Sequence, residues 1–112
     1  MPRRSRLEIL FEQHIADAGL PMPEYIQYKF HPTRKWTSDF CYYKLHLLVE
    51  VEGGTWVGGH QKERFLTDCE KYAEAQILGW RVLRIPGTWV HDGTGVQYLA
   101  RLIHTLEKEN TR

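Results

Sequence analysis

Leu45-His46-Leu47-Leu48-Val49-Glu50-Val51-Glu52 is a mostly apolar run that ends in two glutamates and is followed by the pair Gly53-Gly54. Short runs of aliphatic and branched residues between turn residues are typical of buried strands, and a glycine pair interrupts them. Because side chains alternate along a strand, Glu50 and Glu52 share one face and Val49 and Val51 the other. The sequence therefore predicts a strand over 45–52 that ends in neighbouring carboxylates.

The pattern on either side of this strand predicts an α/β domain. Ser5 and Glu8 have the spacing of a capping box and mark the start of the first helix. Gly79 is expected just beyond the end of the second predicted helix, over 62–78. In chain order we expect a helix over 7–18, strands over 25–30, 35–43 and 45–52, a helix over 62–78, a strand over 80–85 and a helix over 95–107. The order α-β-β-β-α-β-α favours a four-stranded mixed sheet flanked by helices.

Length and composition point to one ordinary globular domain over residues 1–112. Hydrophobic residues make up 42% and charged residues 26%, which excludes disordered and fibrous classes. No apolar run approaches the roughly 20 residues that span a bilayer, so we expect a cytoplasmic protein without a membrane partner. Cys41 and Cys69 form no CxxC pattern, which indicates two buried or half-buried free thiols. The loop over 53–59 lacks the GxxxxGK[ST] spacing, so no nucleotide cofactor is expected.

Three carboxylates make a metal site the main functional hypothesis. Glu50 and Glu52 would repel each other on one strand face, and a divalent cation would relieve that repulsion. Asp39 falls inside the preceding strand, where aspartate is disfavoured, and a tight turn would bring it beside Glu50. Asp39, Glu50 and the carbonyl of Val51 could then hold Mg²⁺, or Mn²⁺ in its place. The alternative is that Asp39 faces solvent and Glu52 is an ordinary strand-end residue.

Several segments together resemble the PD-(D/E)XK nuclease superfamily, and more closely the small phage and bacterial endonuclease domains related to the very-short-patch repair nucleases. The resemblance implies a restriction-endonuclease-like core with Asp39 and Glu50 as metal ligands. Glu52 stands where the superfamily pattern has its lysine, and could instead bind metal or act as a general base. The matching segments are 30–36 with Asp39-Phe40, 48–56, 68–72 and 79–84.

Two further residues are candidates for the catalytic set. Lys71, on the second predicted helix, could supply the cation missing at position 52. The alternative is a salt bridge to Glu74 or Asp68 on its own helix, or a solvated side chain. Glu8 corresponds to a first-helix glutamate that often points toward the metal in related junction nucleases. Its role in the capping box is an equally good explanation.

The candidate DNA contacts are local groups of cations and two loop residues. The formal net charge is only +1, whereas nucleic-acid binders commonly carry a larger positive balance. Phosphates would be held by exposed cations, and an aromatic ring could stack on a base or wedge into distorted DNA. Surface exposure or core packing explains the loop residues equally well. The candidates are Arg34, Lys35, Lys62, Arg64, Trp56 and His60.

These features lead to three hypotheses for function. The first is a Mg²⁺-dependent DNA endonuclease that selects branched or junction DNA, or nicks duplex, in phage or bacterial recombination or repair. Symmetric cutting of a junction would require a homodimer. The second is a catalytically inert DNA-binding domain that retains the nuclease fold. The third is an unrelated α/β interaction domain with a solvated acidic edge.

Overall fold

The computed structural model describes residues 4–53 and 61–110. Its four strands form one sheet in the order β1-β2-β3-β4. The β1–β2 and β2–β3 pairs are antiparallel and the β3–β4 pair is parallel, so the sheet is mixed, as predicted. The elements are α1 (Arg6–Asp17), β1 (Tyr25–Lys29), β2 (Thr37–Tyr42), the 3₁₀ turn η1 (Tyr43–Leu45), β3 (Leu47–Glu52), α2 (Gln61–Ile77), β4 (Arg81–Pro86), α3 (Gly87–Asp92) and α4 (Thr94–Asn110).

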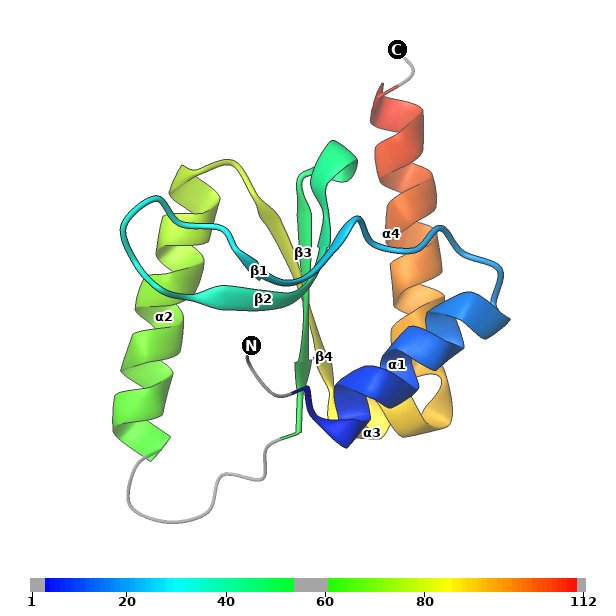
Figure 1. Ribbon diagram of the computed structural model, residues 1–112, viewed down its shortest axis with the longest axis horizontal. Helices are drawn as coiled ribbons and strands as arrows, with labels where there is room; N and C mark the ends of the chain where they lie inside the picture. The colour runs from blue at the N-terminus through cyan, green and yellow to red at the C-terminus, as the bar shows by residue number, and fades with distance from the viewer. Residues whose placement is uncertain (1–3, 54–60, 111–112) are drawn as a thin grey trace.

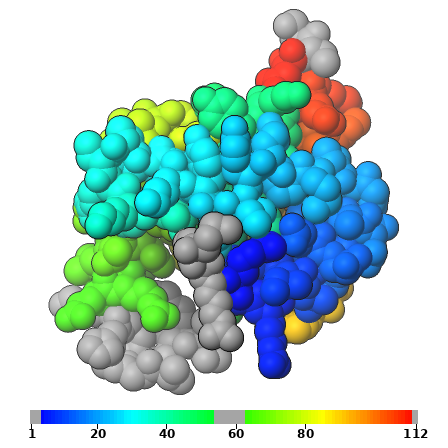
Figure 2. Space-filling model, in the orientation of Figure 1, coloured from blue at the N-terminus to red at the C-terminus, as the bar shows by residue number. Residues whose placement is uncertain are grey.

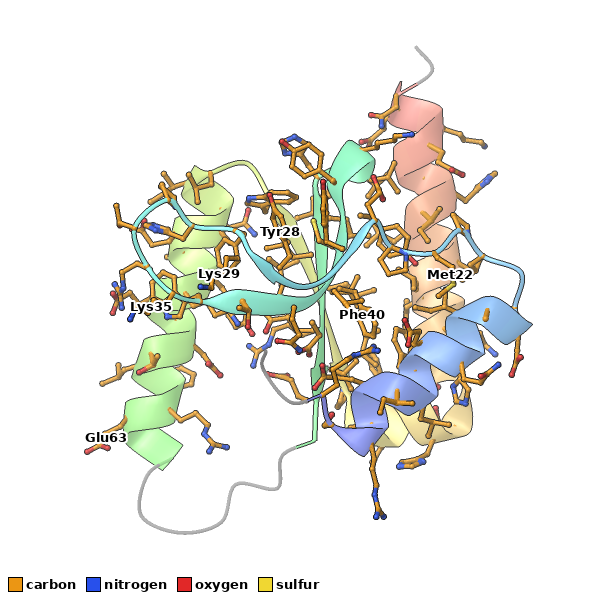
Figure 3. All side chains as sticks on the ribbon, in the orientation of Figure 1. Met22, Tyr28, Lys29, Lys35, Phe40 and Glu63 are labelled. Atoms are coloured by element: carbon orange, nitrogen blue, oxygen red, sulfur yellow. The ribbon has the colours of Figure 1, made fainter. Side chains whose placement is uncertain are left out.

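Helices lie on both sides of the sheet: α1, α3 and α4 on one side and α2 on the other (Figure 1). Alternation along β3 divides the core between these sides. Leu47 and Val49 join the large cluster with α1 and α4, whereas Leu48 joins a smaller cluster with Ala75 of α2. Figure 3 shows Phe40 on the α1 and α4 side of the sheet. The large cluster contains the buried residues Phe11, Ile15, Phe40, Tyr42, Leu47, Val49, Ile85, Val90, Leu99, Ile103 and Leu106.

The structure corrects the sequence prediction at three element boundaries. A short helix, α3, follows β4 directly. We expected Pro86-Gly87 only to interrupt the chain, but Pro86 is the N-cap of this helix, with an extended backbone at the φ of −69° that its ring favours. The turn before β3 is longer than expected, because η1 carries Leu45 and His46 takes a left-handed φ of 51°. β2 begins at Thr37 rather than Lys35.

The two cysteines are both free, as expected, but the prediction that both thiols are at least half-buried is wrong for Cys69. Cys41 on β2 is fully buried and Cys69 on α2 is exposed. Burial raises the pKa of the Cys41 thiol to about 12, because the thiolate loses its hydration. None of the helices in the described ranges is long and apolar enough to cross a membrane.

The segment from the end of α1 through β1 forms a band across the face of the molecule shown in Figure 2, with α1 and α2 below it at either side. The β1–β2 connection reaches α2, where Arg34 pairs with Glu70. In the other direction, α1 contacts β3. The end of the sheet where β2 begins and β3 finishes therefore lies between the two helices that carry Glu8 and Lys71.

Candidate active site

The backbone pairing between β2 and β3 covers only half of each strand. It joins Phe40 to Val49, Cys41 to Leu48 and Tyr42 to Leu47. Before Phe40 on β2 and after Val49 on β3, the two strands are linked by side chains instead. This opening places polar groups inside the sheet, where backbone groups would otherwise satisfy one another.

Ser38 and Asp39 fill the opening. The Ser38 hydroxyl lies 3.0 Å from the carbonyl oxygen of Phe40 and 3.2 Å from that of Val49. Asp39 Oδ2 accepts a hydrogen bond from the backbone N–H of Val51 at 2.8 Å. Extending the register by one residue places Asp39 opposite Glu50. The aspartate that is unusual in a strand is thus explained by its bond to the neighbouring strand.

The Val51 carbonyl belongs to the same opening. In an extended strand the N–H and C=O of one residue point toward the same neighbouring strand. Since the Val51 N–H faces Asp39, its carbonyl oxygen faces the β2 side as well. Two carboxylates and one carbonyl, the oxygen ligands that Mg²⁺ prefers, therefore lie around the place where β2 and β3 separate.

Glu50 is buried with one of its two oxygens satisfied. The carboxylate is held by Lys71 of α2, whose Nζ lies 2.7 Å from Oε1 and 2.8 Å from the carbonyl oxygen of Thr37. Oε2 is buried and forms no hydrogen bond of ordinary geometry within the described part of the chain. Burial raises the pKa of Glu50, while Lys71 and the nearby Tyr72 hydroxyl oppose the rise. An unsatisfied buried carboxylate oxygen is costly, and a cation would satisfy it.

Asp39 and Glu8 are joined by a residue that the sequence did not indicate. Gln27 of β1 donates through Nε2 to Glu8 Oε1 at 2.5 Å and to Asp39 Oδ1 at 3.1 Å. Burial, followed by the charges of Glu8 and Glu50, raises the pKa of Asp39 to about 6, against the hydrogen bonds that lower it. The structure thus brings three carboxyl groups of the prediction, Glu8, Asp39 and Glu50, to one region.

The two carboxylate oxygens of Glu8 have different partners. Its Oε2 accepts a bond from the Ser5 N–H at 3.0 Å, and the Ser5 hydroxyl accepts one from the Glu8 N–H at 3.1 Å. This is the expected capping box. Its other oxygen faces Gln27. Capping the helix and facing the carboxylate cluster are therefore compatible, because the two oxygens are used separately.

Glu52 lies in a different environment from Glu50. It pairs with Arg84 of β4, which also lies 3.6 Å from Asp68 and 4.6 Å from the centre of the Tyr72 ring. The side chain of Glu52 is 36% exposed. The repulsion expected between the two glutamates is therefore partly offset within the protein, because Lys71 pairs with Glu50 and Arg84 pairs with Glu52. Both cations come from elements distant in sequence, so strand alternation alone could not identify them.

Lys71 is directed to Glu50 because its expected helical partners are engaged elsewhere. Glu74 lies 2.8 Å from His31 Nε2, and Asp68 faces Arg84. The side chains of Lys71 and Glu50 are only 13% and 10% exposed. Their pairing is thus mostly shielded from solvent, where charge interactions are stronger than at the surface.

The candidate DNA contacts are only partly described. Arg34 pairs with Glu70 and lies 4.0 Å from the centre of the Trp36 ring. Lys35 and Arg64 are exposed, and Figure 3 shows Lys35 on the β1–β2 connection. Trp56, His60 and the Lys62 side chain lie outside the described residues.

No group of three or more His, Cys, Asp or Glu side chains in the described ranges is arranged to hold a metal ion. The set considered from the sequence is smaller, since it combines Asp39 and Glu50 with a backbone carbonyl. Mg²⁺ commonly uses one or two carboxylates and keeps several waters. The oxygens present, and the unsatisfied Glu50 Oε2 in particular, are consistent with such an ion.

Comparison with known proteins supports the fold. No protein-family model matches the sequence, and no curated protein matches it. Among solved structures, the chain is similar to the catalytic domain of the homing endonuclease I-Bth0305I, with a TM-score of 0.67 and 21% identity over 92% of this chain and 98% of that one. The likeness confirms the predicted fold class, a four-stranded mixed sheet flanked by helices in a restriction-endonuclease-like arrangement.

Proposed function

We propose that this chain is a DNA endonuclease that hydrolyses phosphodiester bonds with the help of Mg²⁺, for which Mn²⁺ can substitute. Asp39, Glu50 and the Val51 carbonyl would hold the ion. The observation that carries the proposal is the opening between β2 and β3, where Asp39 stands opposite Glu50 and the buried Glu50 Oε2 forms no hydrogen bond of ordinary geometry within the described residues. The similarity in fold to the catalytic domain of a homing endonuclease supports DNA as the substrate.

The charge balance of the site favours a divalent cation. Lys71 contributes one positive charge next to Glu50, whereas the Glu8 and Asp39 carboxyl groups share a neutral amide. Like charges at close range disfavour ionisation, which contributes to the raised pKa of Asp39. A divalent ion would compensate the negative charge that Lys71 leaves and favour the ionised form of Asp39.

When bound, the metal would activate a water molecule and stabilise charge on the phosphate. Asp39 and Glu50 would orient the ion, because Asp39 is fixed by the Val51 N–H and Glu50 by Lys71. The Lys71 ammonium would lie beside the scissile phosphate and stabilise its negative charge. We therefore assign to Lys71 the place of the superfamily lysine. Glu52, held by Arg84, has a supporting position at the edge of the site.

We further propose that the substrate is recognised by its structure rather than by its base sequence. The described cations that could approach phosphates, Arg34, Lys35 and Arg64, are exposed side chains of the kind that hold the backbone without reading bases. Branched or junction DNA, or a duplex to be nicked, fits this mode, as in phage or bacterial recombination and repair. Symmetric cutting of a junction would require a homodimer.

The test is cleavage of supercoiled, linear, single-stranded and four-way-junction DNA with Mg²⁺, with Mn²⁺ and with chelator. We expect metal-dependent cutting that falls at least about 100-fold in Asp39→Asn, a loss of roughly 2.7 kcal/mol in transition-state stabilisation. The matched control is Glu109→Gln, which removes an exposed carboxylate paired with Arg81 at 3.5 Å, far from the site in sequence. Equal activity in Asp39→Asn and wild type would refute the mechanism.

A second candidate function has its own observation in favour. The described part of the chain contains no cluster of three metal-ligating side chains, and Lys71 already occupies one side of Glu50. These features would suit an inert DNA-binding domain that retains the fold. Binding of junction DNA without cutting in either metal, and without any effect of Asp39→Asn on affinity, would favour that alternative.

A further inference from the structure

Gln27 occupies the centre of the carboxylate cluster although it carries no charge. Its side-chain amide uses both of its donor hydrogens, one toward Glu8 on α1 and one toward Asp39 on β2. Its carbonyl oxygen accepts a bond from the Thr37 hydroxyl at 3.2 Å. One side chain thus connects α1, β1 and β2 at the site.

The backbone of Gln27 is strained. Its φ is +48°, in the left-handed region that is unfavourable for a residue with a side chain. The pairing on either side is regular, from Ile26 with Phe40 to Tyr28 with Ser38. The register is the same on both sides, but no Gln27–Asp39 pair is formed between them, so the strain is confined to one residue at an interruption of the ladder. Such strain persists where surrounding interactions over-determine it, and functional sites are common places for it.

The orientation of the amide is decided by its neighbours. Reversing it would place the Gln27 carbonyl oxygen against two carboxylates and remove both donors. Thr37 would tolerate either orientation, since a hydroxyl can donate or accept. The Nε2 group therefore faces Glu8 and Asp39 for an electrostatic reason, and it brings two groups of like charge to a common donor.

A neutral donor has a property that a cation lacks. A lysine in the same place would also hold Glu8 and Asp39 together, but it would cancel one negative charge and repel a divalent ion. The amide links the carboxylates and leaves their charge in place. Residues that orient metal ligands through hydrogen bonds typically change metal affinity by 10–100-fold when they are replaced.

We propose that Gln27 is a positioning residue of the metal site: its amide holds the Glu8 and Asp39 carboxylates together before the cation binds, without neutralising them. The inference rests on the proposed function for the identity of the cation. It adds a residue whose action is exerted through Glu8 and Asp39 rather than on the substrate.

The experiment compares Gln27→Met, Gln27→Glu and Gln27→Lys with wild type by thermal melting in chelator and by Mn²⁺ titration calorimetry. Without metal at pH 7.5, we expect Gln27→Lys to melt highest and Gln27→Glu lowest, with Gln27→Met below wild type. Mn²⁺ should bind to Gln27→Met about tenfold more weakly than to wild type, and still more weakly to Gln27→Lys. Gln27→Glu, which loses the donors but adds a carboxylate, should bind Mn²⁺ more tightly than Gln27→Lys.

The opposite order of the charged variants in the two measurements distinguishes positioning from packing. Gln27→Met keeps the size of the side chain, so equal melting and equal Mn²⁺ affinity in Gln27→Met and wild type would overturn the proposal. Gln13→Met is the matched control, because Gln13 donates to Asp17 at 2.9 Å on the exposed side of α1, and it should alter neither measurement.

Failure of the proposed role of Gln27 and failure of the proposed nuclease function would give different results. A wild-type protein that bound no Mn²⁺ and cut no DNA would refute the metal-dependent nuclease. Gln27 would then be judged from metal-free melting alone. A melting order of Lys above Gln above Met at position 27 would support its role in holding the carboxylates, and equal melting of the three would overturn it.

Discussion

The two halves of the β2–β3 pair are held together by different interactions. In the closed half, from Phe40–Val49 to Tyr42–Leu47, the ladder is continuous and its side chains are buried and mostly apolar. In the open half, Ser38 and Asp39 replace backbone pairing with side-chain bonds. The closed half stabilises the fold by burial of apolar surface. The open half gathers carboxylates at a cost in stability, which is the arrangement expected of a functional site.

The largest loss of stability should come from truncating a buried side chain of the closed half. Phe40 is fully buried, so Phe40→Ala should lower the free energy of unfolding by about 3–5 kcal/mol, through lost burial and the remaining cavity. Urea denaturation measures it. Ile26→Ala is the control on the adjacent strand, because Ile26 pairs with Phe40 but is 41% exposed. Similar losses in the two variants would contradict the division of the core.

The next largest loss of stability should come from breaking the ion pair between Lys71 and Glu50. Lys71→Met leaves the buried Glu50 carboxylate without its cation, and we expect a loss of about 3 kcal/mol in chelator at pH 7.5. The loss should shrink at pH 4.5, because burial raises the pKa of Glu50 and the protonated acid needs no partner. Adding Glu50→Gln should restore most of the stability. A loss independent of pH would show that Lys71 acts through packing instead.

A smaller change in stability should come from the ionisation of Asp39 as pH rises. Its folded-state pKa of about 6 lies above the ordinary value of 3.8, so the unfolded chain releases its proton first. Metal-free stability should therefore fall as pH rises from about 4 to 6 and then level off. Asp39→Asn should remove about 1–2 kcal/mol of this fall. Urea midpoints in chelator at pH 4 and 7.5 measure it, and identical pH profiles in the two proteins would contradict the assignment.

The smallest change in stability is expected from replacing Glu52. Its ion pair with Arg84 is more than one-third exposed on both sides, and such pairs contribute about 0–1 kcal/mol. Glu52→Gln should therefore change the unfolding free energy by less than 1 kcal/mol. Metal binding should weaken far less than in Glu50→Gln, as measured by Mn²⁺ titration. An equal loss of Mn²⁺ affinity in the two variants would make Glu52 a ligand.

The sequence predicts the frame of this molecule better than its site. The apolar run of β3 and the capping box at Ser5 and Glu8 are local patterns, and both predictions are confirmed. Asp39 could be singled out because aspartate is unusual inside a strand. The pairing of Lys71 with Glu50 joins elements distant in sequence, so it could not be inferred from spacing.

Gln27 gives no sequence signal at all. Its place in the cluster depends on a left-handed backbone within a strand, and the aromatic and branched residues around it predict only ordinary extended structure. Its polarity between Ile26 and Tyr28 is also normal for a strand with one exposed face. Its left-handed φ and its distances to Glu8 and Asp39 distinguish it in the structure.

The contrast between the two thiols makes the protein suitable for site-specific spectroscopy. At neutral pH a maleimide probe should react with the exposed Cys69 and leave Cys41 untouched, because the latter is buried and its pKa is about 12. Cys69 borders a cavity of about 340 Å³ with Phe65, Asp68, Tyr72 and Arg84. A fluorophore there would report on α2, the helix that carries Lys71, in the native sequence and without an introduced cysteine.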